Sequence, residues 1–384
     1  SVPGINGINT GGVPGTNPTI RIRGIGSINA SAAPLIIVDG APFNGDLNSI
    51  AQEQVASISV LKDASSTALY GSRAANGVII VNTKSGKKST PTEISLSTVY
   101  GSSSMATPMH DLLGVDDYTR YYWEAYSNNE QYENNLSPAA AAAAASSNLV
   151  SALAYNPYGV PNPVDNQGNL TADAAWSTDW KDVMLNTTAY KKQHGLSVSG
   201  GSEKTNFYFG SNYLREQGQI KSTYFERFAT RLNINTTVND FISSGLNMSY
   251  TTSKQNTPNQ SGTSFSNSIQ WIYTIPSYYP LYKRDAQGMI TNDGNGNPLF
   301  DYGNNNGQIV NGVRPALSNE NAYGAILNNE ILKNRTYVSM NGFIKIDLLP
   351  QLNFKSNILY ERFIFDGSNY THNEFGAAAS VNGR

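Results

Sequence analysis

The sequence predicts a transmembrane, antiparallel, all-β barrel that is incomplete in this chain and is preceded by a small α+β domain. Three observations predict this fold class. Short apolar runs are packed closely near the N-terminus, long segments of alternating apolar and polar residues follow, and short and long connections succeed one another between these segments. No apolar run approaches the roughly 18 residues of a membrane helix, so strands would make any membrane crossing.

The composition of the 384 residues fits this class. Charged residues make up 14%, whereas soluble domains are closer to about a quarter charged, and there are 23 tyrosines. The net charge of −2 gives no broad basic field for nucleic acid. The absence of cysteine excludes disulfides, thiolate metal sites and cysteine nucleophiles.

The stretch from Pro34 to Lys84 predicts the α+β domain. Its apolar runs are rich in β-branched residues and read as strands buried on both faces: Leu35–Val38, Ile58–Leu61 and Val78–Val81. Between the last two runs we expect a helix over Ala64–Tyr70. Asp63 would cap it by accepting the Ser66 amide, and Gly71 would end it in a left-handed conformation. Asn76-Gly77 predicts a tight turn into the last strand.

The same residues resemble a known family. Val38-Asp39-Gly40, Leu61-Lys62-Asp63-Ala64 and the run from Tyr70 to Gly77 are similar to the plug domain of TonB-dependent outer-membrane transporters, in particular the SusC/RagA branch. The alternating segment Thr19–Gly24 resembles the early strand of such plugs. The resemblance implies a signature of structural residues: Arg21, Arg23, Gly24, Asp39, Gly40, Lys62, Asp63, Tyr70, Gly71, Arg73, Asn76 and Gly77.

Arg21 and Arg23 share one face of their segment, opposite Ile20 and Ile22. The resemblance favours a role in which these arginines pair with carboxylates on the barrel wall. The alternative is a half-exposed strand whose arginines are solvated.

A short basic segment that ends at Pro91 marks the domain boundary, with a plug at residues 1–88 and barrel strands at 89–384. Beyond it, seven segments alternate between an apolar and a polar face. They are carried by Ile94–Tyr100, Leu196 and Val198, Phe207–Tyr213, Phe228–Val238, Ile242–Tyr250, Val338–Leu348, and Leu352–Tyr360. Most are longer than the roughly five or six residues of a soluble sandwich strand, and they match a tilted membrane crossing.

The connections between these segments run long, short, medium, short, long, short, which places every long loop on one side. Short turns on one side and long loops on the other are typical of outer-membrane barrels. An antiparallel barrel needs an even number of strands, and housing a plug takes about 22, so we expect the plug and the first third of a longer barrel. The resemblance also implies that the segment contacting TonB precedes the plug.

The long outer loops contain the candidate binding residues Trp123, Trp176, Trp271 and Tyr273. Aromatic rings outside a transporter could stack on sugars; alternatively, they pack the loops together or lie in the interfacial aromatic belt. Ser137-Pro138 predicts a helix start ahead of seven alanines. Asp165–Gly168, Asp285–Gly288 and Asp293–Asn297 predict hairpin turns, since the full calcium-loop pattern is missing.

No enzymatic motif is found. The three histidines, His110, His194 and His372, belong to no metal or nucleophile motif, and the carboxylates are scattered. We therefore expect no catalysis, no cofactor and no metal site.

The resemblance implies TonB-dependent active import of oligosaccharides across the bacterial outer membrane. The implied partners are a SusD-like surface lipoprotein, TonB with ExbB and ExbD, and the lipid bilayer. Peptide import, as in RagA, and siderophore or cobalamin uptake are alternatives within the class. A surface adhesin or carbohydrate-binding protein is the alternative from another class, although it would have no use for a plug.

Overall fold

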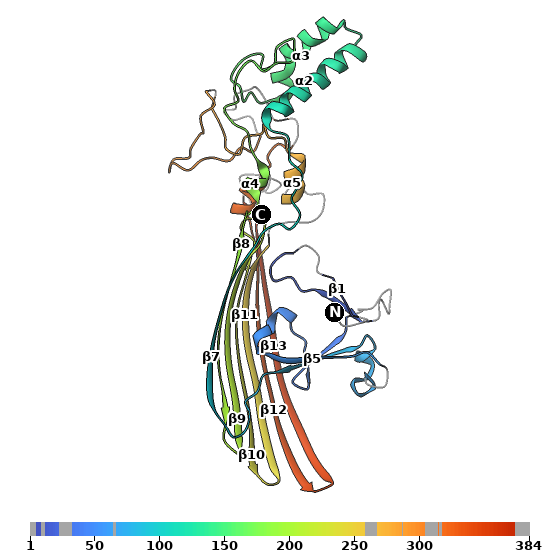
Figure 1. The fold of residues 1–384 in the computed structure, drawn as a ribbon, viewed down its shortest axis with the longest axis vertical. Coiled ribbons are helices and arrows are strands. Elements are labelled where there is room, and N and C mark those ends of the chain that lie inside the picture. Colours follow the sequence, from blue (N-terminus) through green and yellow to red (C-terminus); the bar gives the residue numbers. More distant parts are fainter. Residues whose placement is uncertain are drawn as a thin grey trace.

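The computed structural model describes residues 5–8, 12–22, 33–63, 67–257, 267–285, 287–303, 314 and 317–372. A tall curved sheet of seven strands dominates the fold, with a smaller domain against one face and helical loops at one end (Figure 1). The strands follow chain order as an antiparallel meander: β7 (Thr90–Ser103), β8 (Ala189–Gly201), β9 (Thr205–Gln217), β10 (Tyr224–Asn239), β11 (Ile242–Asn256), β12 (Glu330–Leu349) and β13 (Leu352–Tyr370). The seven predicted strands are confirmed.

The two faces of the curved sheet differ in polarity, as the alternation predicts. The inward face, which meets the N-terminal domain, buries polar side chains such as Asn212, Asn233 and Gln255. The outward face carries exposed apolar side chains, among them Ile94, Leu96, Leu196, Phe209, Phe228, Ile344 and Ile358. Successive residues of a strand point to opposite faces, so one sequence pattern builds both surfaces.

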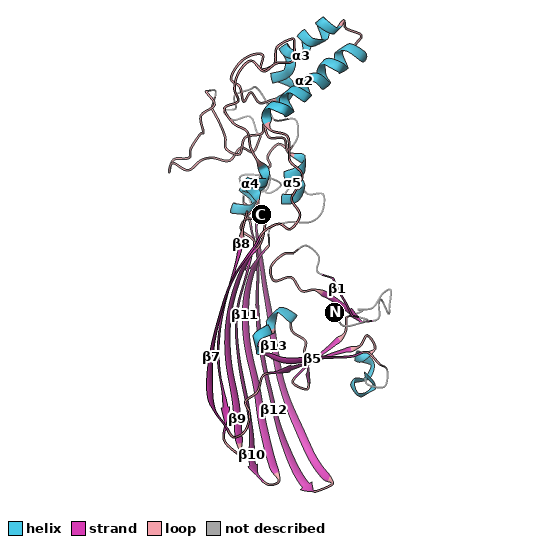
Figure 2. Ribbon diagram, viewed as in Figure 1, coloured by secondary structure: helices cyan, strands magenta, loops and turns pink. Residues whose placement is uncertain are grey.

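The connections fall on the two ends of the sheet as predicted. The β8–β9, β10–β11 and β12–β13 turns lie at one end, and the long loops extend from the other (Figure 2). The first long loop contains α2 (Val115–Tyr132), α3 (Pro138–Leu153) and α4 (Trp180–Met184); the third contains α5 (Ser268–Thr274) and α6 (Ala322–Asn328). Ser137 caps α3 with Pro138 in its first turn, as expected. No described helix is long and apolar enough to cross a membrane.

The N-terminal domain contains a four-stranded sheet in the order β4-β3-β6-β5. Its strands are β3 (Leu35–Val38), β4 (Ala41–Pro42), β5 (Val55–Leu61) and β6 (Val78–Thr83), and β3 pairs with β6 in parallel. A separate hairpin joins β1 (Ile5–Ile8) and β2 (Thr19–Ile22). The sheet ends at Thr83 and β7 begins at Thr90, so the expected boundary lies in the connecting segment.

Two local expectations for this domain are wrong. The run within β5 is not buried on both faces: Ile58 is 62% exposed, because β5 is an edge strand while β3 and β6 are central. The described helical residues include the 3-10 helix η3 (Ala68–Ala74), in which Gly71 has non-helical φ and ψ and separates two short helical turns, so the first of them ends at Gly71 as expected. Gly71 adopts φ 67° and ψ −158°, a kink and not a left-handed cap. Residues 64–66, including the expected cap acceptor Ser66, lie outside the described residues.

Two turns of the domain depend on their glycines. The predicted Asn76-Gly77 turn is confirmed, with Gly77 at φ 92°. Asp39 and Gly40 join β3 to β4 with φ values of 48° and 82°, the positive pair that a two-residue hairpin favours. The sequence Val38-Asp39-Gly40 therefore forms a tight turn.

We expect Leu196→Arg to impair barrel assembly because it places a charge on the outward face near the middle of β8. The cost is about 2–4 kcal/mol at the centre of a bilayer. Ser197→Arg, one residue away on the inward face, is the matched control and should cost much less. The yield of folded, heat-modifiable protein in outer-membrane fractions measures both, and equal loss for the two variants would contradict the assignment of the faces.

Candidate functional site

The inward face of the curved sheet forms the first candidate site, where it meets the N-terminal domain. Its buried polar side chains are Gln193, Asn212, Arg227, Arg231, Asn233, Thr251, Ser253, Gln255 and Asn341. Burying a polar group without a hydrogen bond costs roughly 1–3 kcal/mol, and an unpaired charge costs more. The N-terminal domain supplies partners for most of them.

Asp39 is the centre of one contact group. Its Oδ2 lies 3.0 Å from Arg231 Nη1, and the amide of Thr83 donates to Oδ1 at 2.8 Å. The Thr83 hydroxyl also donates to Oδ2 at 2.7 Å. Asn233 Nδ2 donates to Thr83 Oγ1 at 2.9 Å and to the Lys84 carbonyl at 2.7 Å. The tight turn thus holds a carboxylate against both β6 and the curved sheet.

A second group surrounds Arg227. Its Nη1 donates to the carbonyls of Asn48 at 3.1 Å and Ile50 at 3.3 Å, and its Nη2 donates to Asn212 Oδ1 at 3.2 Å. Glu53 lies 4.0 Å from Nη2 and also accepts from Gln193. An arginine with only 7% of its side chain exposed is therefore bound mostly by backbone carbonyls.

Further polar contacts continue along the interface. Arg335 Nε lies 3.0 Å from Asp46 Oδ2. Asn44 Nδ2 donates to Glu361 Oε2 at 2.9 Å, and Thr251 donates to the Ser49 carbonyl at 2.8 Å. The main aromatic contact is Phe43 against Tyr337, edge to face at 5.0 Å. The interface is held by hydrogen bonds and ion pairs more than by apolar packing.

The ion pairs described across this interface do not involve Arg21, and their arginines come from the curved sheet. Among the described residues the arginines lie on the curved sheet (Arg227, Arg231 and Arg335), and the carboxylates come from the N-terminal domain: Glu53, Asp39 and Asp46. The side chain of Arg21 is half-buried and forms no ion pair in the described contacts. Arg23 and Gly24 lie outside the described residues. The expected pairing of Arg21 with a wall carboxylate therefore stays a prediction, since the seven described strands are only part of the barrel wall.

The remaining signature residues mainly shape the N-terminal domain. Tyr70 packs against the cluster around Ile37 and Val78. Arg73 Nη2 donates to Asn44 Oδ1 at 3.1 Å, and Asn76 Nδ2 to the Ala33 carbonyl at 3.5 Å. Lys62 and Asp63 are exposed after β5, where the Asp63 carbonyl accepts the Thr67 amide at 3.0 Å.

The outer loops share one apolar core. Trp180 of the first loop meets Trp271 of the third edge to face, with ring centroids 5.5 Å apart. Asp301 and Arg314 form a fully buried ion pair at 3.5 Å, and Tyr155 Oη donates to Asp301 Oδ2 at 2.6 Å. Burial raises the pKa of Tyr155, which keeps this donor protonated. The two loops therefore form one body.

This core contains most of the predicted sugar-stacking residues. Trp271 is 1% exposed and Trp176 is 8% exposed, with Trp176 Nε1 bonded to the Tyr278 carbonyl at 2.9 Å. Trp123 is half-buried and joins α2 to α3 by donating to Ser146 Oγ at 2.9 Å. The structure contradicts a sugar-stacking role for Trp176 and Trp271, because their rings are buried where the loops pack together. Tyr273, 50% exposed, stays a candidate.

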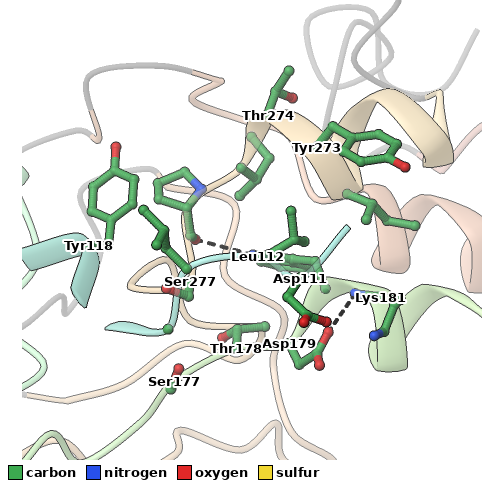
Figure 3. Close-up of a pocket in the computed structure, with 16 residues that line it drawn as sticks. Asp111, Leu112, Tyr118, Ser177, Thr178, Asp179, Lys181, Tyr273, Thr274 and Ser277 are labelled. Atoms are coloured by element: carbon green, nitrogen blue, oxygen red, sulfur yellow. Dashed lines mark hydrogen bonds between the residues drawn. The ribbon is translucent and has the colours of Figure 1, made fainter. Parts of the chain in front are cut away.

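Tyr273 borders a cavity of about 520 Å³ between the first and third loops (Figure 3). Three chain segments line it: residues 111–114 and Tyr118, residues 177–181, and residues 272–277. They bring hydroxyls, the charged Asp111 and Lys181, and the apolar Leu112 together. Burial raises the pKa of Tyr118, followed by the effect of Tyr279, so this phenol is a neutral donor at physiological pH. Sequence reasoning missed the cavity because its lining is spread over more than 160 positions.

The three predicted hairpin turns are confirmed. Asp165, Asp285 and Asp293 each accept two backbone amides of their own loop through Oδ1, at 2.8–3.0 Å. Hydrogen bonds, that of Asn297 first, lower the pKa of Asp293. The described part of the chain holds no group of three potential metal ligands.

Comparison with known proteins agrees with this geometry. Residues 1–78 match the TonB-dependent receptor plug domain family. A TonB-dependent receptor, P3, of Formosa agariphila is 35% identical over 240 residues, which cover 62% of this chain and 19% of that protein. SusC of Bacteroides thetaiotaomicron is 31% identical over 243 residues, covering 61% of this chain and 20% of SusC. The chain belongs to the SusC/RagA-type TonB-dependent receptors.

The solved RagAB peptide transporter has the same fold, with a TM-score of 0.72 at 24% identity over 97% of this chain and 40% of that one. The chain spans about a fifth of the length of the curated relatives. The N-terminal domain is thus a plug, and the curved sheet is part of the wall of an outer-membrane β-barrel. The inward face is the lumen face, and the outward face is the lipid face.

We expect Asp39→Asn to loosen the plug from the wall. Asparagine retains the turn, because Asn-Gly also favours positive φ, but it leaves Arg231 buried without its counter-charge. Removing one partner of a buried pair costs about 3–5 kcal/mol. Faster hydrogen exchange of the β3 and β6 amides in the full-length receptor measures the effect.

Asp347→Asn is the control for this prediction, since its pair with Lys345 has side chains 43% and 38% exposed. Exposed pairs contribute only about 0–1 kcal/mol. The double variant Asp39→Asn/Arg231→Gln should lose less than the sum of its single variants. If the hydrogen exchange of the β3 and β6 amides is unchanged in Asp39→Asn, the contact between Asp39 and Arg231 does not hold the plug.

Proposed function

We propose that the chain forms the plug and the adjoining wall of a TonB-dependent importer that takes oligosaccharides across the outer membrane. The observation that carries the proposal is a plug held inside a barrel wall by buried polar contacts centred on Asp39–Arg231 and Arg227. An adhesin or a passive carbohydrate-binding protein has no need of such a domain in its lumen. The proposed activity is transport without chemical change of the substrate.

The contacts suit a plug that must move. A neutral hydrogen bond to the wall contributes a net of roughly 0.5–1.5 kcal/mol, because water replaces the lost partner. Since the lumen is wet, a pulled plug can exchange contacts such as Gln255 to the Pro14 carbonyl for water one at a time. In the proposed mechanism TonB, energised through ExbB and ExbD by the inner-membrane proton gradient, supplies that pull.

The cavity beside Tyr273 supports an oligosaccharide as substrate. Its exposed ring offers a stacking surface, while Ser177, Thr178 and Ser277 bring hydroxyl groups for hydrogen bonds. In this proposal a SusD-like surface lipoprotein would cover the loops and deliver the sugar.

A peptide is the second candidate substrate. Asp111 and Lys181 give the cavity charges of both signs, which would suit the termini of a short peptide better than a neutral sugar. The RagAB structures with the same fold are those of a peptide importer. Siderophore or cobalamin uptake has less support, because SusC is among the similar curated proteins.

The test is uptake by cells that produce the full-length receptor with its lipoprotein. Radiolabelled oligosaccharides and peptides are offered as separate pools, with and without a protonophore that collapses the proton gradient. Gradient-dependent uptake of oligosaccharides supports the proposal. Uptake of peptides alone would mean that the substrate is a peptide and not an oligosaccharide. Uptake that continues in the presence of the protonophore would contradict TonB-driven import.

We expect Tyr273→Ala to weaken oligosaccharide binding by up to about tenfold with an unchanged melting temperature, because the ring is exposed and a lost stacking contact costs about 0.5–1.5 kcal/mol. Tyr132→Ala is the matched control: Tyr132 is 70% exposed at the far end of α2 and does not line the cavity. Isothermal titration with the purified receptor measures both. Equal affinity for the two variants would remove Tyr273 from the binding site.

A further inference from the structure

A row of basic side chains crosses the lipid face of the barrel wall near the outer loops. Its members are Lys192 on β8, Arg215 on β9 and Lys254 on β11. Their neighbours in sequence fix their direction: Gln193 contacts Glu53 of the plug, Leu214 is buried, and Gln255 contacts the Pro14 carbonyl. Because adjacent residues of a strand alternate, the basic side chains point away from the plug.

The sheet register places these residues side by side. Lys192 is the cross-strand partner of Arg215, Arg215 of Glu226, and Glu226 of Lys254. Each lies within three residues of the strand end that leads into the outer connections. The row therefore lies at the outer end of the barrel wall.

The surroundings match the boundary between hydrocarbon and headgroups. Tyr190 and Tyr224 lie one row nearer the loops, and Tyr213 lies one row below. The lipid face becomes apolar at Phe228, which lies directly opposite Tyr213, and one row further down at Leu196. Tyrosine girdles flank the apolar band of outer-membrane barrels, so the basic row lies at headgroup level.

Among the described residues, the positive charges of the row outnumber the acids that contact them. Glu226 Oε2 lies 3.8 Å from Arg215 Nη1, and Glu226 Oε1 accepts from the Tyr213 hydroxyl at 3.0 Å. Lys192 and Lys254 form no ion pair with any described residue. Like charges directly opposed across a strand pair, as in Lys192 and Arg215, are destabilising unless an anion lies between them. The next acid along this level, Asp366, is two strands beyond Lys254.

We propose that this row binds a phosphorylated lipid of the outer leaflet. One phosphate would lie between Lys192 and Arg215, which are one strand spacing apart, about 5 Å. Lys254 is two strand spacings beyond Arg215, about 10 Å, and would contact a second phosphate of the same headgroup. The acyl chains would then lie along the apolar surface at Leu196 and Phe228. Nothing in this site depends on the transported substrate.

The test uses the full-length receptor with its lipoprotein in mild detergent, and the probe is a glycolipid with two phosphates. Lys192→Gln/Arg215→Gln should weaken its binding about 30-fold, since each basic residue contributes about 1 kcal/mol near an anionic surface. Native mass spectrometry and the lipid-induced rise in melting temperature both report binding. Glu226→Gln, which removes the competing acid, should strengthen it.

Lys333→Gln is the matched control, because Lys333 pairs in register with the inward Gln255 and lies at the same height on the lumen face. It should bind the glycolipid like the unmodified receptor. Heat-modifiability shows that each variant is folded. The proposal would be overturned if the double variant bound the glycolipid as tightly as the unmodified receptor does. It would also be overturned if the dephosphorylated glycolipid bound as tightly as the phosphorylated one. An equal shift with inorganic phosphate alone would assign the row to free anions instead of a lipid.

Discussion

The structure depends on one constraint: the barrel wall buries charged and amide side chains that only the plug can satisfy. Arg231 and Arg227 lie on the lumen face with side chains 7% exposed, and an unpaired guanidinium there would be strongly unfavourable. The plug answers Arg231 with the carboxylate of Asp39, and Arg227 with the carbonyls of Asn48 and Ile50 and the more distant carboxylate of Glu53. The Asp39-Gly40 turn and the irregular segment around Asn48 are therefore interface elements as much as connections.

The forces that hold the parts together differ in kind. The outer loops share a large apolar core around Trp180 and Trp271, whereas the plug has two small apolar clusters around Ile37 and Ile79. Plug and wall meet mainly through polar groups. An apolar core loses its whole contribution when water enters, but a polar interface recovers much of its hydrogen bonding. Under a pull on the plug, its contacts with the wall would therefore yield while the loop body stays intact.

Much of the fold is local in sequence, and those parts were predictable. Period-two alternation located β7 to β13, and connection lengths assigned the ends of the barrel. Burial within the plug was less predictable, because no local pattern marks β5 as an edge strand. The Asp39–Arg231 pair joins positions 192 residues apart, which no local pattern indicates. A tryptophan in a loop gives the same sequence signal whether its ring faces a ligand or a core. Trp176 and Trp271 were therefore wrongly predicted to bind sugar. The Asp-Gly turn was readable from sequence and was overlooked.

On three strands of the wall, a side chain on the lipid face and a side chain on the lumen face belong to adjacent residues. Lys192 and Gln193, Glu226 and Arg227, and Lys254 and Gln255 are neighbours in sequence that point to opposite sides. The row at headgroup level therefore lies at the same height as the contacts with Glu53, Asn48 and Pro14 of the plug. A phosphate bound between Lys192 and Arg215 would relieve repulsion between β8 and β9 where Gln193 holds the plug. The lipid environment and the seating of the plug would then be coupled through a rigid sheet, without any moving element between them.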